Sequence, residues 1–295
     1  MKNPVFTGAA VAIITPMYED GSINFDELGR IIEDQIARGT DAIVICGTTG
    51  ECSTMTDEEQ LAAIKFTVET VNHRVPVIAG AGSNDTDHGC ALAAKSAACG
   101  ADALLLVTPY YNKATQAGLY AYFTRIADES ALPVMLYNVP ARTGLNMLPE
   151  TCERLAHHPG MIGVKEAADD LGQLARLTAL TPLPVYCGSD QWMAPALRLG
   201  ARGVISVLSN LCPEAVRILC QSQQKGCEQS AAAQQRHLAA LTDALFCEVS
   251  PSPVKYALSL LGLCRAEVRL PLVPLQPGSR ERLQSLLARH GLLPA

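Results

Sequence analysis

Eight short apolar runs, separated by longer segments with helical periodicity, constrain the fold of this 295-residue chain more than any other feature. Continuous apolar runs of this length predict strands that are buried on both faces, as in a parallel sheet covered by helices. Their spacing of about 20–35 residues fits strand–helix units. The runs are residues 8–16, 41–46, 75–81, 101–107, 132–138, 161–165, 183–187 and 203–207.

Eight such units predict an α/β fold, a (β/α)8 TIM barrel with a C-terminal helical extension. An open, doubly wound sheet is the alternative, but its first turn should carry the pattern G-x-G-x-x-G. The first run ends instead in Thr15-Pro16-Met17. From about residue 213 the pattern is helical, with breaks at 250–253 and 271–278. We therefore expect a catalytic barrel over residues 1–228 and a C-terminal helical region over residues 229–295.

Composition excludes several classes of protein. The net charge of −6 is mild and the basic residues are dispersed, so no nucleic-acid surface is expected. No apolar run approaches the roughly 18 residues of a membrane span, and the N-terminus lacks the apolar region of a signal peptide. The eleven cysteines include no C-x-x-C pair, and the six histidines show no metal-ligand spacing. We therefore expect a cytoplasmic protein without disulfides, metal or membrane attachment.

Lys165 is the strongest candidate for chemistry, because a barrel carries its active site where the strands end. It is the one lysine of seven that closes an apolar run. Burial at a barrel mouth disfavours the charged ammonium, and the neutral amine can form a Schiff base with a carbonyl substrate. The alternative is a structural salt bridge to Glu166. Adjacent strand residues point to opposite faces, however, which makes that pairing awkward.

Two further run ends offer groups that such chemistry needs. Tyr137 ends the preceding run, and its phenol can carry protons to and from a carbinolamine, although a core tyrosine with a satisfied hydroxyl is the alternative. Thr48 and Thr49 lie between Gly47 and Gly50. The two glycines permit a tight turn whose amides and hydroxyls can hold a carboxylate, although a plain connecting turn has equal weight.

Arg142 lies in the loop that follows Tyr137, between the turn formers Pro140 and Gly144. A guanidinium in a rigid loop suits bidentate capture of a substrate carboxylate. A solvated loop arginine is the commoner case, so the residue alone does not decide between the two interpretations.

Together these motifs resemble the dihydrodipicolinate synthase and N-acetylneuraminate lyase family of pyruvate-dependent class I aldolases. The resemblance spans essentially the whole chain, and the motifs occur in the order and spacing of the family. Residues 110–113, 142–144 and 252–255 resemble its synthase branch, whereas its sugar-acid lyases differ around position 142. The three motifs are Gly47-Thr48-Thr49-Gly50-Glu51, Tyr137-Asn138-Val139-Pro140 and Gly163-Val164-Lys165-Glu166-Ala167.

The resemblance implies a role for each matching residue. Lys165 is expected to form an imine with pyruvate, which then loses a methyl proton to give an enamine. Tyr137, Thr48 and Tyr111 match the proton relay, with Tyr111 supplied by a neighbouring subunit. Thr49 matches the residue that holds the pyruvate carboxylate.

The resemblance also implies the second substrate and the assembly. Arg142 is expected to orient L-aspartate 4-semialdehyde through its carboxylate, and Gly188 and Ile205 match backbone contacts around the pocket. The product is then 4-hydroxy-tetrahydrodipicolinate, on the path to lysine and diaminopimelate. The family implies a homotetramer without metal or organic cofactor. The alternatives are an aldolase for a 2-keto-3-deoxy sugar acid or other 4-hydroxy-2-oxo acid and, against the intact motifs, a degenerate barrel without activity.

Two features depart from the family pattern. Cys52 stands where the family usually has a small hydroxyl residue or alanine, and a thiol donates hydrogen bonds poorly, so second-substrate contacts there are expected to be weaker. Lysine-sensitive members tend to carry a glutamate at the position of His88 and histidines at those of Asp57 and Gln60. We therefore expect weak or absent inhibition by lysine. The residues that match the effector site are Ser53, Asp57, Gln60, Asn84, His88 and Tyr110.

Overall fold

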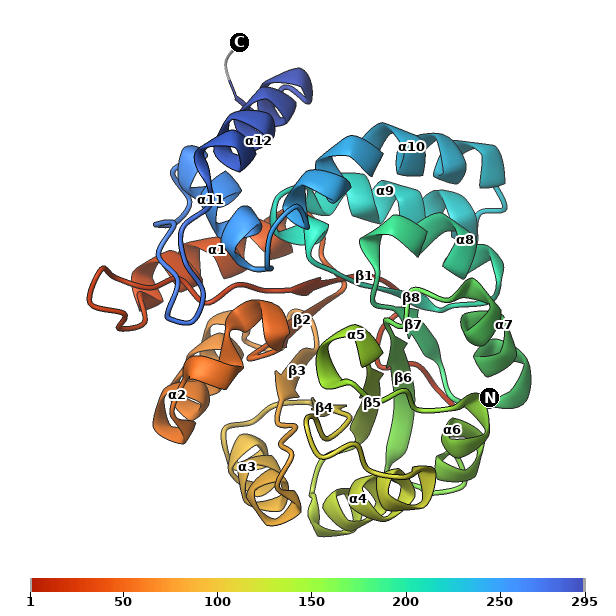
Figure 1. Cartoon of the computed structure of the whole chain (residues 1–295). Helices are drawn as coiled ribbons and strands as arrows, with labels where there is room; N and C mark the ends of the chain where they lie inside the picture. The colour runs from red at the N-terminus through yellow and green to blue at the C-terminus, as the bar shows by residue number, and fades with distance from the viewer. Residues whose placement is uncertain (1, 294–295) are drawn as a thin grey trace.

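The computed structural model describes residues 2–293, and its centre is a closed barrel of eight parallel strands (Figure 1). Each strand falls on one of the predicted runs, and β8 pairs with β1 to close the sheet. The predicted TIM barrel is therefore confirmed. The strands are β1 (Gly8–Ala12), β2 (Ala42–Ile45), β3 (Val77–Gly80), β4 (Ala103–Val107), β5 (Val134–Asn138), β6 (Met161–Glu166), β7 (Val185–Cys187) and β8 (Gly203–Ser206).

Helices surround the barrel and extend beyond it at the C-terminal end (Figure 1). No helix within residues 2–293 is long and apolar enough to cross a membrane. The α-helices are α1 (Phe25–Ala37), α2 (Asp57–Val71), α3 (Thr86–Ala98), α4 (Gln116–Glu129), α5 (Pro140–Thr143), α6 (Pro149–Leu155), α7 (Leu171–Leu180), α8 (Met193–Arg198), α9 (Pro213–Gln224), α10 (Glu228–Leu245), α11 (Ser252–Leu260) and α12 (Pro277–Arg289). The 3-10 helices are η1 (Thr48–Gly50), η2 (Cys52–Thr54), η3 (Asp190–Trp192) and η4 (Leu208–Asn210).

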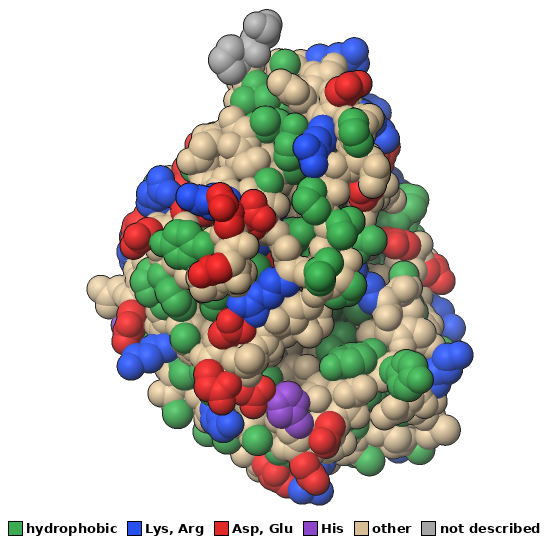
Figure 2. Space-filling model, turned by 60° about the vertical axis from the view of Figure 1, so that its left-hand side comes forward, with side chains coloured by type: hydrophobic (Ala, Val, Ile, Leu, Met, Phe, Trp, Pro, Cys, Tyr) green, Lys and Arg blue, Asp and Glu red, His purple; other side chains and the backbone are tan. Residues whose placement is uncertain are grey.

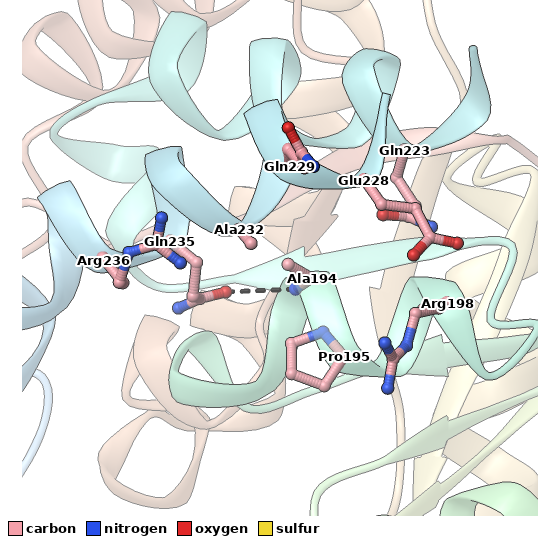
Figure 3. A pocket seen from close by; sticks show the side chains of 9 residues that line it. All are labelled: Ala194, Pro195, Arg198, Gln223, Glu228, Gln229, Ala232, Gln235 and Arg236. Atoms are coloured by element: carbon pink, nitrogen blue, oxygen red, sulfur yellow. Dashed lines mark hydrogen bonds between the residues drawn. The ribbon is translucent and has the colours of Figure 1, made fainter. Parts of the chain in front are cut away.

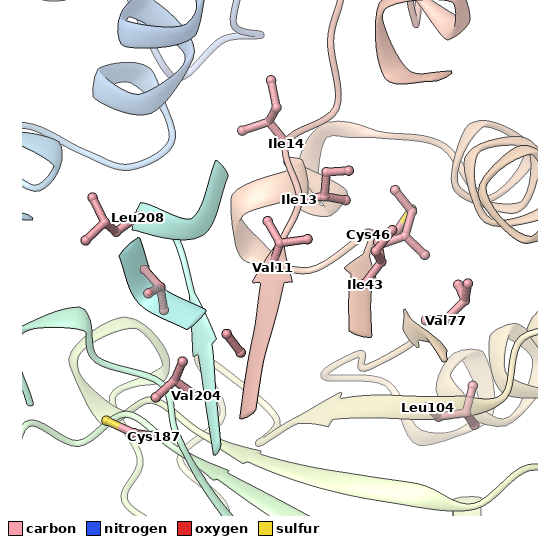
Figure 4. Close-up of a cluster of buried hydrophobic side chains, with 14 of the residues drawn as sticks. Val11, Ile13, Ile14, Ile43, Cys46, Val77, Leu104, Cys187, Val204 and Leu208 are labelled. Atoms are coloured by element: carbon pink, nitrogen blue, oxygen red, sulfur yellow. The ribbon is translucent and has the colours of Figure 1, made fainter. Parts of the chain in front are cut away.

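Side chains of each strand alternate between the barrel interior and the surrounding helices. In β2, Ala42 and Val44 belong to the inner cluster, whereas Ile43 and Ile45 belong to the outer one. Figure 4 shows part of the outer layer, which strand and helix residues form together. Full burial of each large aliphatic side chain contributes about 1.5–3 kcal/mol. This two-sided burial explains why the strands are continuous apolar runs in the sequence.

The start of α2 illustrates how local sequence sets a helix boundary. Thr56 is the N-cap, and its hydroxyl accepts a hydrogen bond from the Glu59 backbone N–H. The Glu59 carboxylate accepts one in return from the Thr56 backbone N–H, which completes a capping box. The helix ends where Asn72 adopts a left-handed conformation. The signal lies entirely in neighbouring residues, so this boundary was predictable.

The breaks between the C-terminal helices lie at other residues than the sequence predicts. The break predicted at 250–253 spans residues 246–251, because α10 ends at Leu245 and α11 already begins at Ser252. The break predicted at 271–278 spans residues 261–276, between the end of α11 at Leu260 and the start of α12 at Pro277. Pro253 occupies the first turn of α11, where a missing backbone N–H costs nothing. Helix α10 packs against α8, α9 and α12, and α11 packs against α12. The proposed division of the chain at residues 228 and 229 stays a prediction.

On the face shown in Figure 2, acidic and basic side chains are interspersed. Ion pairs link segments that are distant in the sequence, such as Arg74 after α2 with Glu33 of α1, and Arg125 of α4 with Asp87 of α3. Mixed surface charge of this kind agrees with the dispersed basic residues of the sequence.

Candidate active site

A cavity of about 410 Å³ opens at the carboxyl ends of the strands. It brings together six predicted site residues that lie far apart in the sequence, which are Thr48, Thr49, Tyr137, Arg142, Lys165 and Gly188. These residues follow or end β2, β5, β6 and β7, so the barrel places them as its geometry predicts.

Lys165 points into the barrel because of the alternation along β6. Its neighbour Val164 belongs to the outer cluster, so Lys165 faces inward. Lys165 pairs in register with Tyr137 of β5, and its Nζ lies 4.3 Å from the centroid of the Tyr137 ring. The lysine is 6% exposed. Within residues 2–293, no carboxylate lies within ion-pair distance of it. A buried amine that faces a cavity without a counter-ion is suited to nucleophilic attack.

Glu166 faces away from Lys165, so the structural salt bridge considered for this pair does not form. Its carboxylate accepts hydrogen bonds from the side chains of Asn138 and Gln173 and from the backbone N–H of Ala168. Burial raises the pKa of Glu166 to about 7, against the opposing effect of these donors. Because Asn138 follows Tyr137 in β5, this network ties the strand of the tyrosine to the strand of the lysine.

The turn that carries Thr48 and Thr49 is a 3-10 helix, η1, at the end of β2. The Gly50 N–H donates to the Gly47 carbonyl at 3.0 Å, which closes the turn. The Thr15 hydroxyl donates to the Gly50 carbonyl at 2.8 Å and ties the turn to the segment after β1. Thr49 is buried, whereas Thr48 is half-buried, and both line the cavity.

Gly188, just beyond β7, leaves room for the side chain of Lys165. A Cβ atom at this position would lie 2.9 Å from Lys165 Cε and 2.8 Å from the Cβ of Ala167. Contacts this short do not occur in folded proteins without displacement of a neighbour. The glycine is therefore a steric requirement for the position of the lysine.

Arg142 stands at the rim of the cavity in the short helix α5. This helix begins with Pro140 and ends at Gly144, whose φ of 70° is the left-handed conformation that favours glycine. The arginine is exposed and lines both the main cavity and a smaller one of about 90 Å³ beside it. A guanidinium at this point can hold an anionic group that enters from solvent.

Two predicted site residues do not line the cavity. Ile205 is 1% exposed and belongs to the inner cluster of the barrel, and Val207 takes its place in the lining at the end of β8. Tyr111 is 86% exposed, with a φ of 73°, and projects from its own chain. The backbone contact expected at Ile205, and the relay role expected of Tyr111 in a neighbouring subunit, therefore stay predictions.

The residues of the predicted effector site are partly engaged with one another. His88 Nε2 lies 2.9 Å from an Asp57 carboxylate oxygen, and Lys95 lies 3.7 Å from the other oxygen of the same carboxylate. The Gln60 side chain donates to the backbone carbonyl of Cys52. Tyr110 is exposed, Asn84 is half-buried, and Ser53 lines the smaller cavity.

Cys52 begins η2, just after the threonine turn, and lines neither cavity. Burial raises the pKa of its thiol to about 11, so the thiol stays protonated at neutral pH. The expected weaker contact with a second substrate at this position therefore finds no support in the lining. All eleven cysteines are free, and no three or more His, Cys, Asp or Glu side chains of residues 2–293 gather as metal ligands would.

Sequence reasoning assigned no role to several residues that line the cavity. Asp190 follows Gly188, and its carboxylate accepts hydrogen bonds from the backbone N–H groups of Val207 and Leu208, which ties the end of β7 to the end of β8. Burial raises the pKa of Asp190, against the opposing effects of Ser206, these N–H groups and Lys165. The C-terminal region contributes Phe246, Glu248, Val249 and Ser250. The sequence shows Asp190 at the end of a predicted strand, which was a signal for the site. No neighbouring residue indicates that residues 246–250 reach the cavity.

A second hollow, of about 450 Å³, lies between α8, α9 and α10 (Figure 3). Gln235 accepts a hydrogen bond from the Ala194 N–H there, and Arg198 and Arg236 stand toward its two sides. The described residues that line it include no lysine, cysteine or histidine.

Comparison with known proteins shows the family of the chain. The sequence profile of the Dihydrodipicolinate synthetase family matches residues 5–290. The chain is 48% identical to the 4-hydroxy-tetrahydrodipicolinate synthase of Thermoanaerobacter sp. (strain X514), over 98% of each chain. It is also 48% identical to that of Acetivibrio thermocellus, over 99% of this chain and 100% of the other. The pyruvate complex of the chloride-inhibited dihydrodipicolinate synthase from Acinetobacter baumannii superimposes with a TM-score of 0.95, at 42% identity over 97% of this chain and 99% of the other. The chain therefore belongs to the Dihydrodipicolinate synthetase family.

Proposed function

We propose that this protein is a lyase that condenses pyruvate with L-aspartate 4-semialdehyde to give 4-hydroxy-tetrahydrodipicolinate, a step of lysine and diaminopimelate biosynthesis. The observation that carries the proposal is Lys165, an inward-facing lysine without an ion-pair partner among residues 2–293, at the base of the cavity beside Tyr137. The names of the relatives, at about half identity over nearly the full length, support the same reaction.

The first half of the reaction uses the inner end of the cavity. The Lys165 amine attacks the C2 carbonyl of pyruvate, and loss of water from the carbinolamine gives an imine. A methyl proton then leaves C3, and the electron pair forms the enamine. Tyr137 stands next to the amine and, with Thr48, is proposed to carry these protons. Thr49 and the amides of its turn are proposed to hold the pyruvate carboxylate.

The second half of the reaction takes place at the rim of the cavity. The enamine carbon attacks the aldehyde carbon of aspartate semialdehyde, and the new alkoxide takes up a proton. The amino group of this substrate then attacks C2, displaces the Lys165 amine and closes the ring. Arg142 at the rim is proposed to orient the aldehyde through its carboxylate. Gly188 keeps the lysine side chain in reach of both substrates, and Ile205 is proposed to contribute through its backbone.

We also propose that the active enzyme is a homotetramer. Tyr111 projects from its own chain as a largely exposed aromatic side chain in a left-handed conformation. An exposed aromatic of this kind suits contact with a second copy. In the tetramer it is proposed to complete the proton relay of a neighbouring subunit.

The imine with Lys165 is itself the electron sink of the reaction, so we propose that no metal or organic cofactor is required. The eleven free cysteines support a reducing, cytoplasmic location.

A coupled assay with purified protein, pyruvate and aspartate semialdehyde tests the function. We expect condensation in the wild type and, in Arg142→Ala, a KM for the aldehyde raised by roughly tenfold or more with a KM for pyruvate that changes little. Failure to condense, together with cleavage of a 2-keto-3-deoxy sugar acid, would assign the alternative aldolase activity. Absence of both activities would support the degenerate barrel.

A further inference from the structure

A second lysine, Lys255 of α11, is buried behind the threonine turn and is 0% exposed. Its Nζ donates to a Glu51 carboxylate oxygen at 2.6 Å. Glu51 is 2% exposed, so the whole ion pair is removed from solvent. The two residues are separated by 204 positions in the chain. The proposed reaction assigns no step to this pair.

Glu51 is the residue that ends the turn. Its backbone has a φ of 58°, and its N–H donates to the Thr48 carbonyl at 3.1 Å. A left-handed conformation at a residue other than glycine persists only where the surroundings hold it. The side chain of Glu51 supplies that hold, because Lys255 binds one carboxylate oxygen and the Arg269 backbone N–H binds the other at 3.1 Å.

Arg269 strengthens the same attachment from a second direction. Its guanidinium donates to the Thr54 carbonyl at 2.7 Å, just beyond the turn, and to the Glu59 carboxylate at the start of α2. The C-terminal region therefore binds Glu51 and also the segment that follows it, up to the start of α2. Glu51 also lines the smaller cavity together with Thr48 and Arg142, which puts the ion pair directly behind the substrate-facing surface.

We infer that Lys255 and Glu51 are positioning residues, whose buried ion pair holds the threonine turn in the geometry that binds pyruvate. This inference rests on the proposed function, in which Thr48 and Thr49 face pyruvate. Displacement of reacting or binding groups by about 1 Å can cost 10²-fold in rate. Loss of the Lys255–Glu51 ion pair, which we call the tether, should therefore weaken pyruvate binding and slow imine formation. The aldehyde site at Arg142 should keep its affinity.

The test needs a variant that removes the tether without leaving a buried charge. Lys255→Met alone leaves the Glu51 carboxylate unpaired, and its effect on folding would obscure its effect on pyruvate. The double variant Lys255→Met/Glu51→Gln removes both charges and keeps an acceptor for the Arg269 N–H. Replacement of a buried ion pair by neutral groups of similar volume is often tolerated.

Steady-state kinetics on the double variant, with pyruvate and aspartate semialdehyde varied in turn, give the result. We expect the KM for pyruvate to rise roughly tenfold and the rate of borohydride-trapped imine formation to fall, with the KM for the aldehyde within about twofold of the wild type. If the double variant folds and its KM for pyruvate is unchanged, the inference is overturned. A wild type that forms no imine with pyruvate would instead overturn the proposed function.

Two further variants keep the test decisive. Glu51→Gln alone preserves the shape of the side chain and one acceptor oxygen, and the buried Lys255 amine can lose its proton and become neutral, so this variant serves if the double variant does not fold. It should raise the KM for pyruvate by about threefold or more, and no rise overturns the inference. Leu287→Ala in α12 removes a buried side chain that lines neither cavity, so it lowers the melting temperature but should leave both KM values unchanged.

Discussion

Lys165 and Lys255 are both buried lysines, and the comparison between them shows how surroundings decide what a lysine does. Lys165 lies at the end of a strand, over the Tyr137 ring and against an open cavity. Lys255 lies in a helix, with its ammonium 2.6 Å from a buried carboxylate. Burial alone therefore does not identify a nucleophile.

The difference lies in the counter-charge. Burial lowers the pKa of Lys255, but the Glu51 carboxylate opposes this effect and favours the charged form. A protonated amine with its hydrogens engaged cannot attack a carbonyl. Lys165 has a cavity where Lys255 has a carboxylate. One lysine is available for a covalent bond, and the other holds two parts of the chain together.

Loss of activity at Lys165 is the largest effect that the comparison predicts. Lys165→Met removes the nucleophile, so condensation should fall by at least about 10³-fold. The melting temperature should stay close to that of the wild type, because no ion pair is broken. Coupled kinetics and calorimetry on the same sample check both halves, and substantial residual activity would separate Lys165 from the chemistry.

The matching change at Lys255 should instead act on stability. Lys255→Met leaves the Glu51 carboxylate buried without its partner, which is expected to lower the free energy of unfolding by about 3–5 kcal/mol. Denaturant titration at a fixed protein concentration measures this loss. If Lys255→Met were as stable as Lys165→Met, the ion pair of Lys255 would not contribute to stability and the two lysines would not differ in this respect.

Glu166 is a third buried ionisable group, and its carboxylate forms no ion pair within residues 2–293. Its pKa is about 7 in the folded protein against an ordinary 4.5, so the folded state holds the proton more tightly. The contribution to stability is complete below pH 4.5 and is lost as the pH rises through 7, by about 3 kcal/mol in total. Glu166→Gln removes this titration.

Denaturant titrations at pH 4.5 and pH 8 measure the effect of Glu166. The wild type should lose about 3 kcal/mol more stability than Glu166→Gln between the two values. The same pH dependence in both proteins would show that the carboxylate ionises without cost. All other shifted groups are shared by the two proteins and cancel in the difference.

The smallest predicted effect concerns lysine as an inhibitor. His88 and Asp57 already contact each other, and Lys95 adds a positive charge beside them, so an incoming lysine ammonium finds no free carboxylate there. Millimolar lysine should reduce the condensation rate by less than about twofold. Potent inhibition in the same assay would refute this prediction.

The position of Lys165 at the barrel mouth was predictable from the sequence. Each strand is a continuous apolar run, and a lysine at the end of such a run stands out. Because successive side chains of a strand point to opposite faces, the sequence also predicted correctly that Lys165 and Glu166 do not pair. Thr48, Thr49, Tyr137, Arg142 and Gly188 followed because every strand end points to the same mouth.

The buried ion pair of Lys255 could not be predicted, because no neighbouring residue in the sequence indicates it. Lys255 sits in an ordinary helical pattern, and its partner lies 204 residues away. The contribution of residues 246–250 to the cavity has the same origin, since only the folded chain brings the segment before α11 over the barrel.

Reductive trapping of the pyruvate imine shows whether Lys165 is the nucleophile. The wild-type protein is incubated with pyruvate, reduced with borohydride, digested and analysed by mass spectrometry. We expect one adduct, on the peptide that contains Lys165, with the peptide that contains Lys255 unmodified. An adduct on any other lysine, or none on Lys165, would contradict this expectation.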